Sequence, residues 1–228
     1  MTAKRLLDVA LASVALIVAL PVLAVAAVGI RLAGSGPILY RAQRVGLHAR
    51  PFTMYKLRTM RVRQSYPTAI TAKDDPRIFP FGALLRRTKL DELPQLFNVL
   101  RGDMALVGPR PEDPRMVEQF YAPLHHETLR VSPGLTCPGS LYAYTHGEAE
   151  LDARDPERCY AERLLPLKLA LDLVYVRRWS LAYDLTLIAR TAWVLGTAFL
   201  GRRTFPLPPE MADARCIMAE SGAVRMTA

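Results

Sequence analysis

The run VALASVALIVALPVLAVAAVGI, residues Val9–Ile30, decides the fold of this 228-residue chain. It carries no charged residue. As a helix rising about 1.5 Å per residue it would be roughly 33 Å long, enough to cross a hydrocarbon core of about 30 Å. A helix in the core of a soluble protein is seldom so uniformly apolar, and a cleaved signal peptide has a shorter apolar region. The run therefore predicts a membrane segment.

Proline interrupts this run near its middle, at Pro21. A proline removes one backbone hydrogen bond and kinks or breaks a helix. Basic residues flank the run on both sides: Lys4, Arg5, Arg31, Arg41 and Arg44. Since Lys and Arg near membrane ends favour the cytoplasmic face, a helix that enters, breaks at Pro21 and returns keeps both clusters inside. We expect residues 1–31 to be such a re-entrant helix, with a single kinked span as the alternative.

The composition is that of a folded, basic protein. Apolar residues make up 51% of the chain, and 30 Lys and Arg against 21 Asp and Glu give a net charge of +9. This hydrophobicity excludes intrinsic disorder, and the charge favours polyanionic partners such as nucleic acid, anionic lipid or phosphorylated metabolites. Cys137, Cys159 and Cys216 form no CxxC pair, which excludes a disulfide framework or a cysteine-rich zinc site.

Downstream of the membrane segment, the pattern predicts a mainly helical α/β domain with a few short strands over residues 32–200 and a loose tail over residues 201–228. Strands are expected at Ile38–Tyr40 and Phe52–Tyr55. Loops are expected at residues 61–80, 108–114 and 132–156, which are rich in proline, glycine and polar residues. Helices are expected over Gly82–Lys89, Glu92–Leu100, Arg115–Tyr121, Pro123–Arg130, Leu164–Tyr175 and Asp184–Leu200.

The last of these helices has an apolar stripe at 3.6-residue spacing that runs from Leu185 to Phe199. The stripe fits a core helix. It also fits a helix lying in the membrane interface with Trp193 at the headgroup level.

Two adjacent carboxylates, Asp91 and Glu92, precede Pro94 and an apolar run. Proline is tolerated in the first helical turn, so both are expected at a helix N-terminus, where plain capping is the simplest role. Cations surround them in the sequence: Lys56, Arg58, Arg61, Arg63, Arg77, Arg86, Arg87, Lys89 and Arg110. Arginine binds phosphate in bidentate fashion, and a carboxylate among cations and a divalent metal can attack phosphorus.

Six segments in this order resemble the bacterial sugar transferases, the monotopic phosphoglycosyl transferases. They are KRLLD at Lys4–Asp8, GPILYR at Gly36–Arg41, KLRTM at Lys56–Met60, DPRI at Asp75–Ile78, LDELPQL at Leu90–Leu96 and GDMALVGPRP at Gly102–Pro111. The similarity extends over about residues 3–200.

The resemblance implies a bacterial inner-membrane enzyme with a re-entrant helix and its catalytic domain on the cytoplasmic face. Its reaction would transfer a phosphosugar from a UDP-sugar to polyprenyl phosphate, release UMP and begin exopolysaccharide or lipid-linked glycan assembly. Asp91 aligns with the nucleophile and Glu92 with its partner at a Mg²⁺ site. Arg86 and Arg110 align with residues near substrate phosphates. Lys56, Arg58 and Arg77 join the expected phosphate-binding set.

Departures from the family pattern leave the sugar open. Leu20 stands where a serine often precedes the membrane proline, and the stretch after Thr136, through Tyr142, Tyr144 and His146, is unusual. Two alternatives are a membrane-tethered polyanion-binding protein and a non-catalytic partner in a polysaccharide assembly complex. No nucleic-acid-binding motif is present, and self-association stays open.

Overall fold

The computed structural model describes residues 2–62, 75–147 and 155–220. It is mainly helical, with two small two-stranded sheets, as the sequence predicts. The helices are α1 (Ala3–Leu32), α2 (Pro80–Arg87), α3 (Gln95–Arg101), α4 (Pro114–Phe120), α5 (Pro138–Tyr142), α6 (Pro156–Cys159), α7 (Leu165–Arg178), α8 (Leu181–Phe199) and α9 (Met211–Glu220). The strands are β1 (Leu39–Val45), β2 (Pro51–Leu57), β3 (Ala105–Val107) and β4 (Gly134–Thr136).

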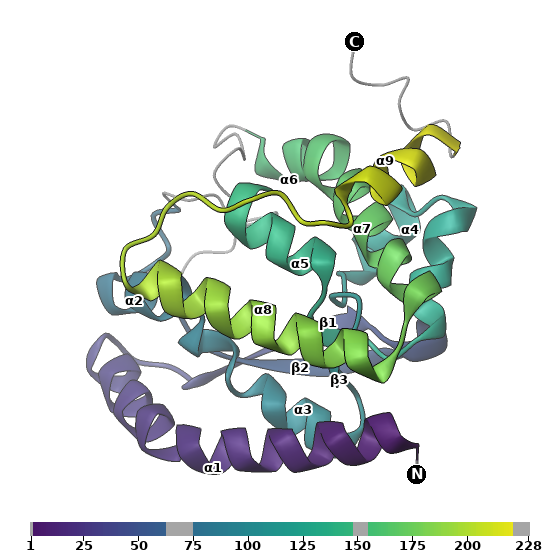
Figure 1. Cartoon of the computed structure of the whole chain (residues 1–228). Coiled ribbons are helices and arrows are strands. Elements are labelled where there is room, and N and C mark those ends of the chain that lie inside the picture. Colours follow the sequence, from purple (N-terminus) through teal and green to yellow (C-terminus); the bar gives the residue numbers. More distant parts are fainter. Residues whose placement is uncertain (1, 63–74, 148–154, 221–228) are drawn as a thin grey trace.

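Helix α1 is long and apolar enough to cross a membrane, and it is bent (Figure 1). Pro21 lies inside it, and proline is the usual cause of a sharp change in helix direction. One face, with Ala12, Ala19 and Ala26, is buried against the rest of the protein. Only 17% of its most apolar window is buried, whereas the core helix of a soluble protein would be mostly buried. The exposed apolar side chains of α1 therefore fit a lipid environment.

Both ends of α1 are fastened to the same domain. At its start, Lys4 pairs with Asp184 at 2.7 Å, and Arg5 donates to the carbonyls of Val99 and Leu100. At its end, the guanidinium of Arg58 donates to the carbonyl oxygens of Ile30, Gly34 and Ser35. Arg58 thus holds the C-terminal end of α1, a different role from the phosphate binding expected of it.

The two sheets bring distant segments together. Strands β1 and β2 form an antiparallel hairpin with Leu39 opposite Leu57, and its other end lies at Val45 and Pro51. Strands β3 and β4 pair in parallel, with Ala105 opposite Gly134. A Cβ atom on Gly134 would lie 2.2 Å from the backbone nitrogen of Gly108, so this close approach requires glycine.

Two segments differ from the sequence prediction. The expected loop 132–156 contains β4, α5 and the π-helix η4 (Ala143–Gly147); residues 148–154 lie outside the described part. The expected loose tail contains α9, which buries Ala214 and Ile217 in a cluster with α7. Residues 63–74 of the expected loop 61–80 and residues 221–228 of the tail also lie outside it. The remaining short helical turns are η1 (Leu47–Ala49), η2 (Leu90–Glu92), η3 (Pro123–Arg130) and η6 (Tyr160–Leu164).

The apolar stripe on α8 is mostly exposed, which contradicts the core-helix interpretation. Leu185 keeps 48% of its surface and Phe199 keeps 78%. The buried face of α8 is instead marked by Asp184, Leu187 and Val194. In Figure 1, α8 lies above α1, and the N-terminal ends of the two helices are joined by the pair of Lys4 with Asp184.

Candidate functional site

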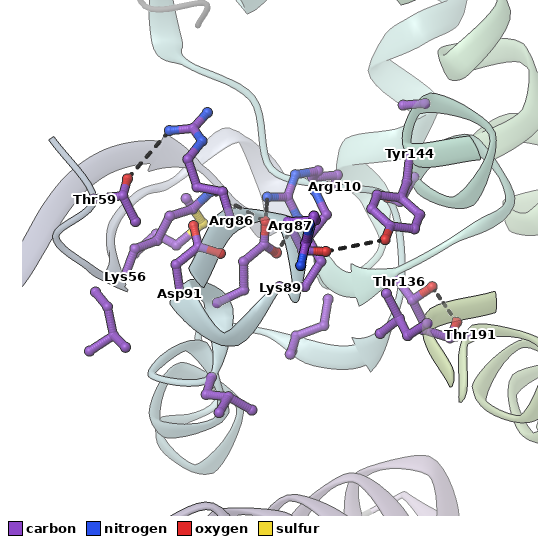
Figure 2. A pocket seen from close by; sticks show the side chains of 18 of the residues that line it. Lys56, Thr59, Arg86, Arg87, Lys89, Asp91, Arg110, Thr136, Tyr144 and Thr191 are labelled. Carbon is purple, nitrogen blue, oxygen red and sulfur yellow. Dashed lines mark hydrogen bonds and ion pairs between the residues drawn. The ribbon is translucent and has the colours of Figure 1, made fainter. Parts of the chain in front are cut away.

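A cavity of about 2020 Å³ lies between α1, the β1–β2 hairpin, the η2 turn and α8. One side, which we call the charged wall, consists of Lys56, Arg86, Lys89, Asp91, Glu92 and Arg110. The opposite side, the far wall, consists of Thr136, Ser140, Tyr144, Ile188, Thr191 and Ala192. Figure 2 shows labelled residues of both walls, with Asp91 and Lys56 well separated from Thr136 and Thr191.

The η2 turn places the two carboxylates in the charged wall. Helix α2 ends at Arg87, and Lys89 then adopts a left-handed backbone conformation (φ 55°, ψ 16°) that redirects the chain. Asp91 and Glu92 follow in a 3₁₀ turn, in which the amide of Glu92 donates to the carbonyl of Lys89. The capping interpretation of Asp91 is wrong, because the N-cap of α3 is Pro94 and no side chain caps that helix.

The carboxylate of Glu92 is bound by two cations, Arg110 and Lys56. The guanidinium of Arg110 donates to both of its carboxylate oxygens, at 2.7 and 2.9 Å, and Lys56 Nζ lies 3.5 Å from Oε1. Although burial opposes ionisation, the charges of Arg110, Lys56 and Lys89 hold the pKa of Glu92 well below its usual value. Glu92 is therefore a fixed negative charge that orients Arg110.

Asp91 is in the opposite situation. It is 6% exposed, and its Oδ1 atom has no hydrogen-bond partner among the described residues. Burial, followed by the charge of Glu92, raises its pKa, while Lys56, Lys89 and Arg86 counteract this effect. A buried carboxylate oxygen without a partner is costly, so such atoms often mark sites of function. Asp91 is the carboxylate of this pair that is available to react.

Lys56 is the titratable cation of the charged wall. Burial is the largest effect on Lys56 and lowers its pKa to about 8. Glu92 acts in the opposite direction and raises the pKa, but the charge of Arg110 partly offsets Glu92. Arg86 and Arg77 have different partners. Arg86 donates to the hydroxyl of Thr59 at 3.4 Å, whereas Arg77 forms a bidentate pair with Asp75. Both arginines line the cavity.

The structure brings together Asp91, Glu92, Lys56, Arg86, Arg110 and Arg77 of the predicted residues around one cavity. Arg58 also borders it, but its guanidinium is bound to the end of α1. Arg63 lies outside the described residues. Sequence reasoning did not anticipate the hydroxyl pair of Thr136 and Thr191, 2.7 Å apart, because these side chains come from β4 and α8.

A Mg²⁺ ion fits this site only with help from a substrate. The described residues contain no group of three or more His, Cys, Asp or Glu side chains that could hold a metal. Mg²⁺ often binds through one or two carboxylates together with substrate phosphates. Asp91 with its unpartnered Oδ1 suits such a role, whereas both oxygens of Glu92 already accept from Arg110.

Comparison with known proteins identifies the family. The chain is 38% identical over 206 residues to a UDP-glucose:undecaprenyl-phosphate glucose-1-phosphate transferase of Xanthomonas campestris pv. campestris, covering 89% of this chain and 40% of that protein. It is 46% identical over 132 residues to a putative undecaprenyl-phosphate N-acetylgalactosaminyl 1-phosphate transferase of Bacillus subtilis, covering 58% and 74%.

A third relative, a UDP-N-acetylgalactosamine-undecaprenyl-phosphate N-acetylgalactosaminephosphotransferase of Aeromonas hydrophila, is 34% identical over 87% of this chain and 45% of its own length. The chain thus spans less than half of the Xanthomonas and Aeromonas relatives. The family model for bacterial sugar transferases matches residues 1–198. The chain belongs to the bacterial sugar transferase family.

Proposed function

We propose that this protein transfers a phosphosugar from a UDP-sugar to polyprenyl phosphate through a covalent intermediate on Asp91. The observation that carries the proposal is the buried, unpartnered Oδ1 of Asp91 in a cavity that also holds Lys56, Arg86 and Lys89. The relatives supply the reaction class, since each is named as a transferase of a sugar phosphate to undecaprenyl phosphate.

In the first step, a carboxylate oxygen of Asp91 attacks the β-phosphorus of the UDP-sugar. The bond from this phosphorus to the bridging oxygen breaks, and its electron pair leaves with UMP. In the second step, a phosphate oxygen of the polyprenyl phosphate attacks the same phosphorus. The acyl phosphate bond then breaks, which restores the carboxylate of Asp91 and leaves the sugar on a polyprenyl diphosphate.

The cations around Asp91 allow a negatively charged substrate to approach this carboxylate. A carboxylate and a diphosphate repel each other, and the charges of Lys56, Lys89 and Arg86 around Asp91 reduce that repulsion. Arg110, oriented by Glu92, adds a further guanidinium to this side of the cavity, where it favours binding of a phosphate group. Mg²⁺ at Asp91 and the donor phosphates would add further positive charge.

We also propose that α1 enters and leaves the membrane on the cytoplasmic side. Its charged residues all lie near its ends, and both ends bind the same domain, through Lys4 and Arg5 at one end and Arg58 at the other. A straight span would place these ends on opposite sides of the bilayer. A re-entrant helix keeps the domain, and with it Asp91, at the surface where the lipid phosphate lies.

Two experiments test these proposals. UMP release is measured with a panel of UDP-sugars, Mg²⁺ and polyprenyl phosphate, beside the Asp91→Asn variant. We expect release with at least one donor and none from the variant; a variant that releases UMP at the normal rate contradicts the role of Asp91 as nucleophile.

A cysteine placed near residue 2 should react with a membrane-impermeant reagent only after the cells are opened, and labelling from outside intact cells contradicts the re-entrant helix.

A further inference from the structure

The turn before Asp91 has an unusual residue at its centre. Lys89 lies in the left-handed region (φ 55°), which glycine adopts freely and residues with a side chain seldom do. The chain nevertheless places a long cationic side chain there. A strained backbone is kept only when the surrounding structure fixes it. The contacts of Lys89 should therefore show what fixes this turn.

Tyr144 contacts this turn at two points from the far wall. Its hydroxyl donates to the carbonyl of Arg87 at 3.4 Å, and the ammonium of Lys89 lies 4.9 Å from the centre of its ring. Figure 2 shows the Tyr144 side chain reaching toward Arg87 and Lys89. A cation at this distance over an aromatic ring is attracted by the ring's electrons. Tyr144 therefore touches both Arg87, the last residue of α2, and Lys89 at the centre of the turn.

Lys89 in turn acts on the reactive pair. It precedes Asp91 by two residues and lines the same wall of the cavity as Asp91 and Glu92, where its positive charge favours the ionised form of both carboxylates. A shift of this cation would change the charge around Asp91 without altering any residue that contacts the substrate. Through its contact with Lys89, a residue of the far wall can therefore influence the charged wall.

Tyr144 lies in a closely packed segment. It belongs to η4, in which His146 stacks on Tyr142, the last residue of α5, with ring centres 5.2 Å apart and planes 9° apart. The ring of His146 also bonds to the backbone carbonyl of Phe205 at 3.2 Å. At the end of η4, a Cβ atom on Gly147 would lie 2.2 Å from Leu164, which shows how closely this turn packs on η6. Such π-helical turns frequently occur at functional sites.

We propose that Tyr144 is a positioning residue: from the far wall it fixes the Arg87–Lys89 turn and holds the ammonium of Lys89 beside Asp91 and Glu92. The inference rests on the proposed function, since it deepens the role of that same site. It assigns the unusual 142–146 segment a part in the reaction rather than only in sugar binding. It also makes the segment around Phe205, through His146, an indirect support of the site.

The test is a double-mutant cycle on the full chain in lipid nanodiscs. Tyr144→Leu is expected to lower kcat/KM about tenfold, the size of a partly buried cation–aromatic contact, and Lys89→Met by at least as much, because it also removes a positive charge near Asp91. The kcat/KM of the double variant should be no lower than that of the poorer single variant, because the two substitutions remove the same interaction. Tyr144→Phe keeps the ring and should recover most of the activity. Tyr144→Met replaces the leucine variant if the latter fails to fold, as judged by thermal unfolding.

A matched control is the pair of Phe97 and Arg101 on α3, another cation–aromatic contact, with a centre distance of 6.0 Å. Phe97→Leu and Arg101→Met should leave kcat/KM unchanged. Additive losses in the Tyr144–Lys89 cycle, or a phenylalanine variant as poor as the leucine variant, overturn the positioning role. UMP binding by calorimetry is measured in parallel. A wild-type chain that neither binds UMP nor releases it contradicts the proposed function itself, whereas an active wild type with additive variants contradicts only the role of Tyr144.

Discussion

The charged wall and the far wall of the cavity are built from different chemistry. The charged wall concentrates carboxylates, lysines and arginines on β2, α2, η2 and the segment after β3. The far wall presents hydroxyls, an aromatic ring and apolar side chains from β4, α5, η4 and α8. This difference suggests a division of labour, in which one wall reacts with phosphate and the other shapes and steadies the space around it.

The largest effect is expected from Asp91→Asn in the charged wall. Removing a nucleophile should lower the rate of UMP release by at least about a thousandfold. Stability should not fall. Because burial raises the pKa of Asp91, its ionised form destabilises the folded protein near neutral pH, and a neutral amide removes that cost. Asp213→Asn, at the exposed pair with Arg178, is the control and should change neither quantity. A marked drop in Tm for Asp91→Asn would mean that the residue is structural.

Arg110→Gln should have the next largest effect. It removes the bidentate partner of Glu92 and a candidate phosphate ligand, so we expect kcat/KM to fall about a hundredfold. Arg110→Lys should recover only part of this loss, because a lysine cannot form the bidentate pair. Steady-state kinetics beside Arg115→Gln, a half-exposed arginine on α4, provides the comparison. Full activity in Arg110→Lys would show that charge alone suffices.

The lowered pKa of Lys56 predicts opposite effects of pH on activity and stability. Its folded pKa is about 8, so kcat/KM should fall about tenfold as pH rises through 8 and its charge is lost. The unfolded chain keeps this proton up to a higher pH, so Lys56 makes the fold more stable as pH rises above 8. Lys56→Arg should remove the alkaline limb of the activity profile. An unchanged limb in that variant would assign the titration to another group.

The smallest effect is expected at the edge of the far wall. Phe205 packs edge-on against Trp193 with ring centres 6.0 Å apart, and its carbonyl bonds to His146. Phe205→Leu should raise the KM for the UDP-sugar about twofold to threefold with little change in kcat. A loss as large as that of Arg110→Gln would show that the two walls are not functionally distinct.

The sequence predicted the charged wall far better than the far wall, and the reason is physical. The charged wall depends on local signals: the β1–β2 hairpin and the η2 turn lie within continuous motifs. The far wall depends on the parallel pairing of Ala105 with Gly134, a contact that no local pattern reveals. A three-residue strand and a π-helix in a stretch rich in glycine and proline resemble a loop when only the sequence is read.

Individual charges show the same limit. The sequence placed Arg58 among the phosphate ligands because it follows Lys56 in one motif, but its side chain turns toward the end of α1. The sequence also could not separate Asp91 from Glu92, since adjacent carboxylates look alike. Their different roles arise from Arg110, which reaches Glu92 from the segment after β3. Helix α9 was missed because it is short and follows a stretch that contains Pro206, Pro208 and Pro209, and because its burial depends on a cluster with distant residues of α7.

The most direct test is the mass of the intact protein after incubation with a UDP-sugar that supports UMP release, without polyprenyl phosphate. The proposed function predicts that the chain gains the mass of one sugar phosphate on the peptide containing Asp91. The adduct should disappear when polyprenyl phosphate is added and be absent from Asp91→Asn. UMP release only when both substrates are present, with no adduct under any condition, would contradict a covalent intermediate and favour direct transfer.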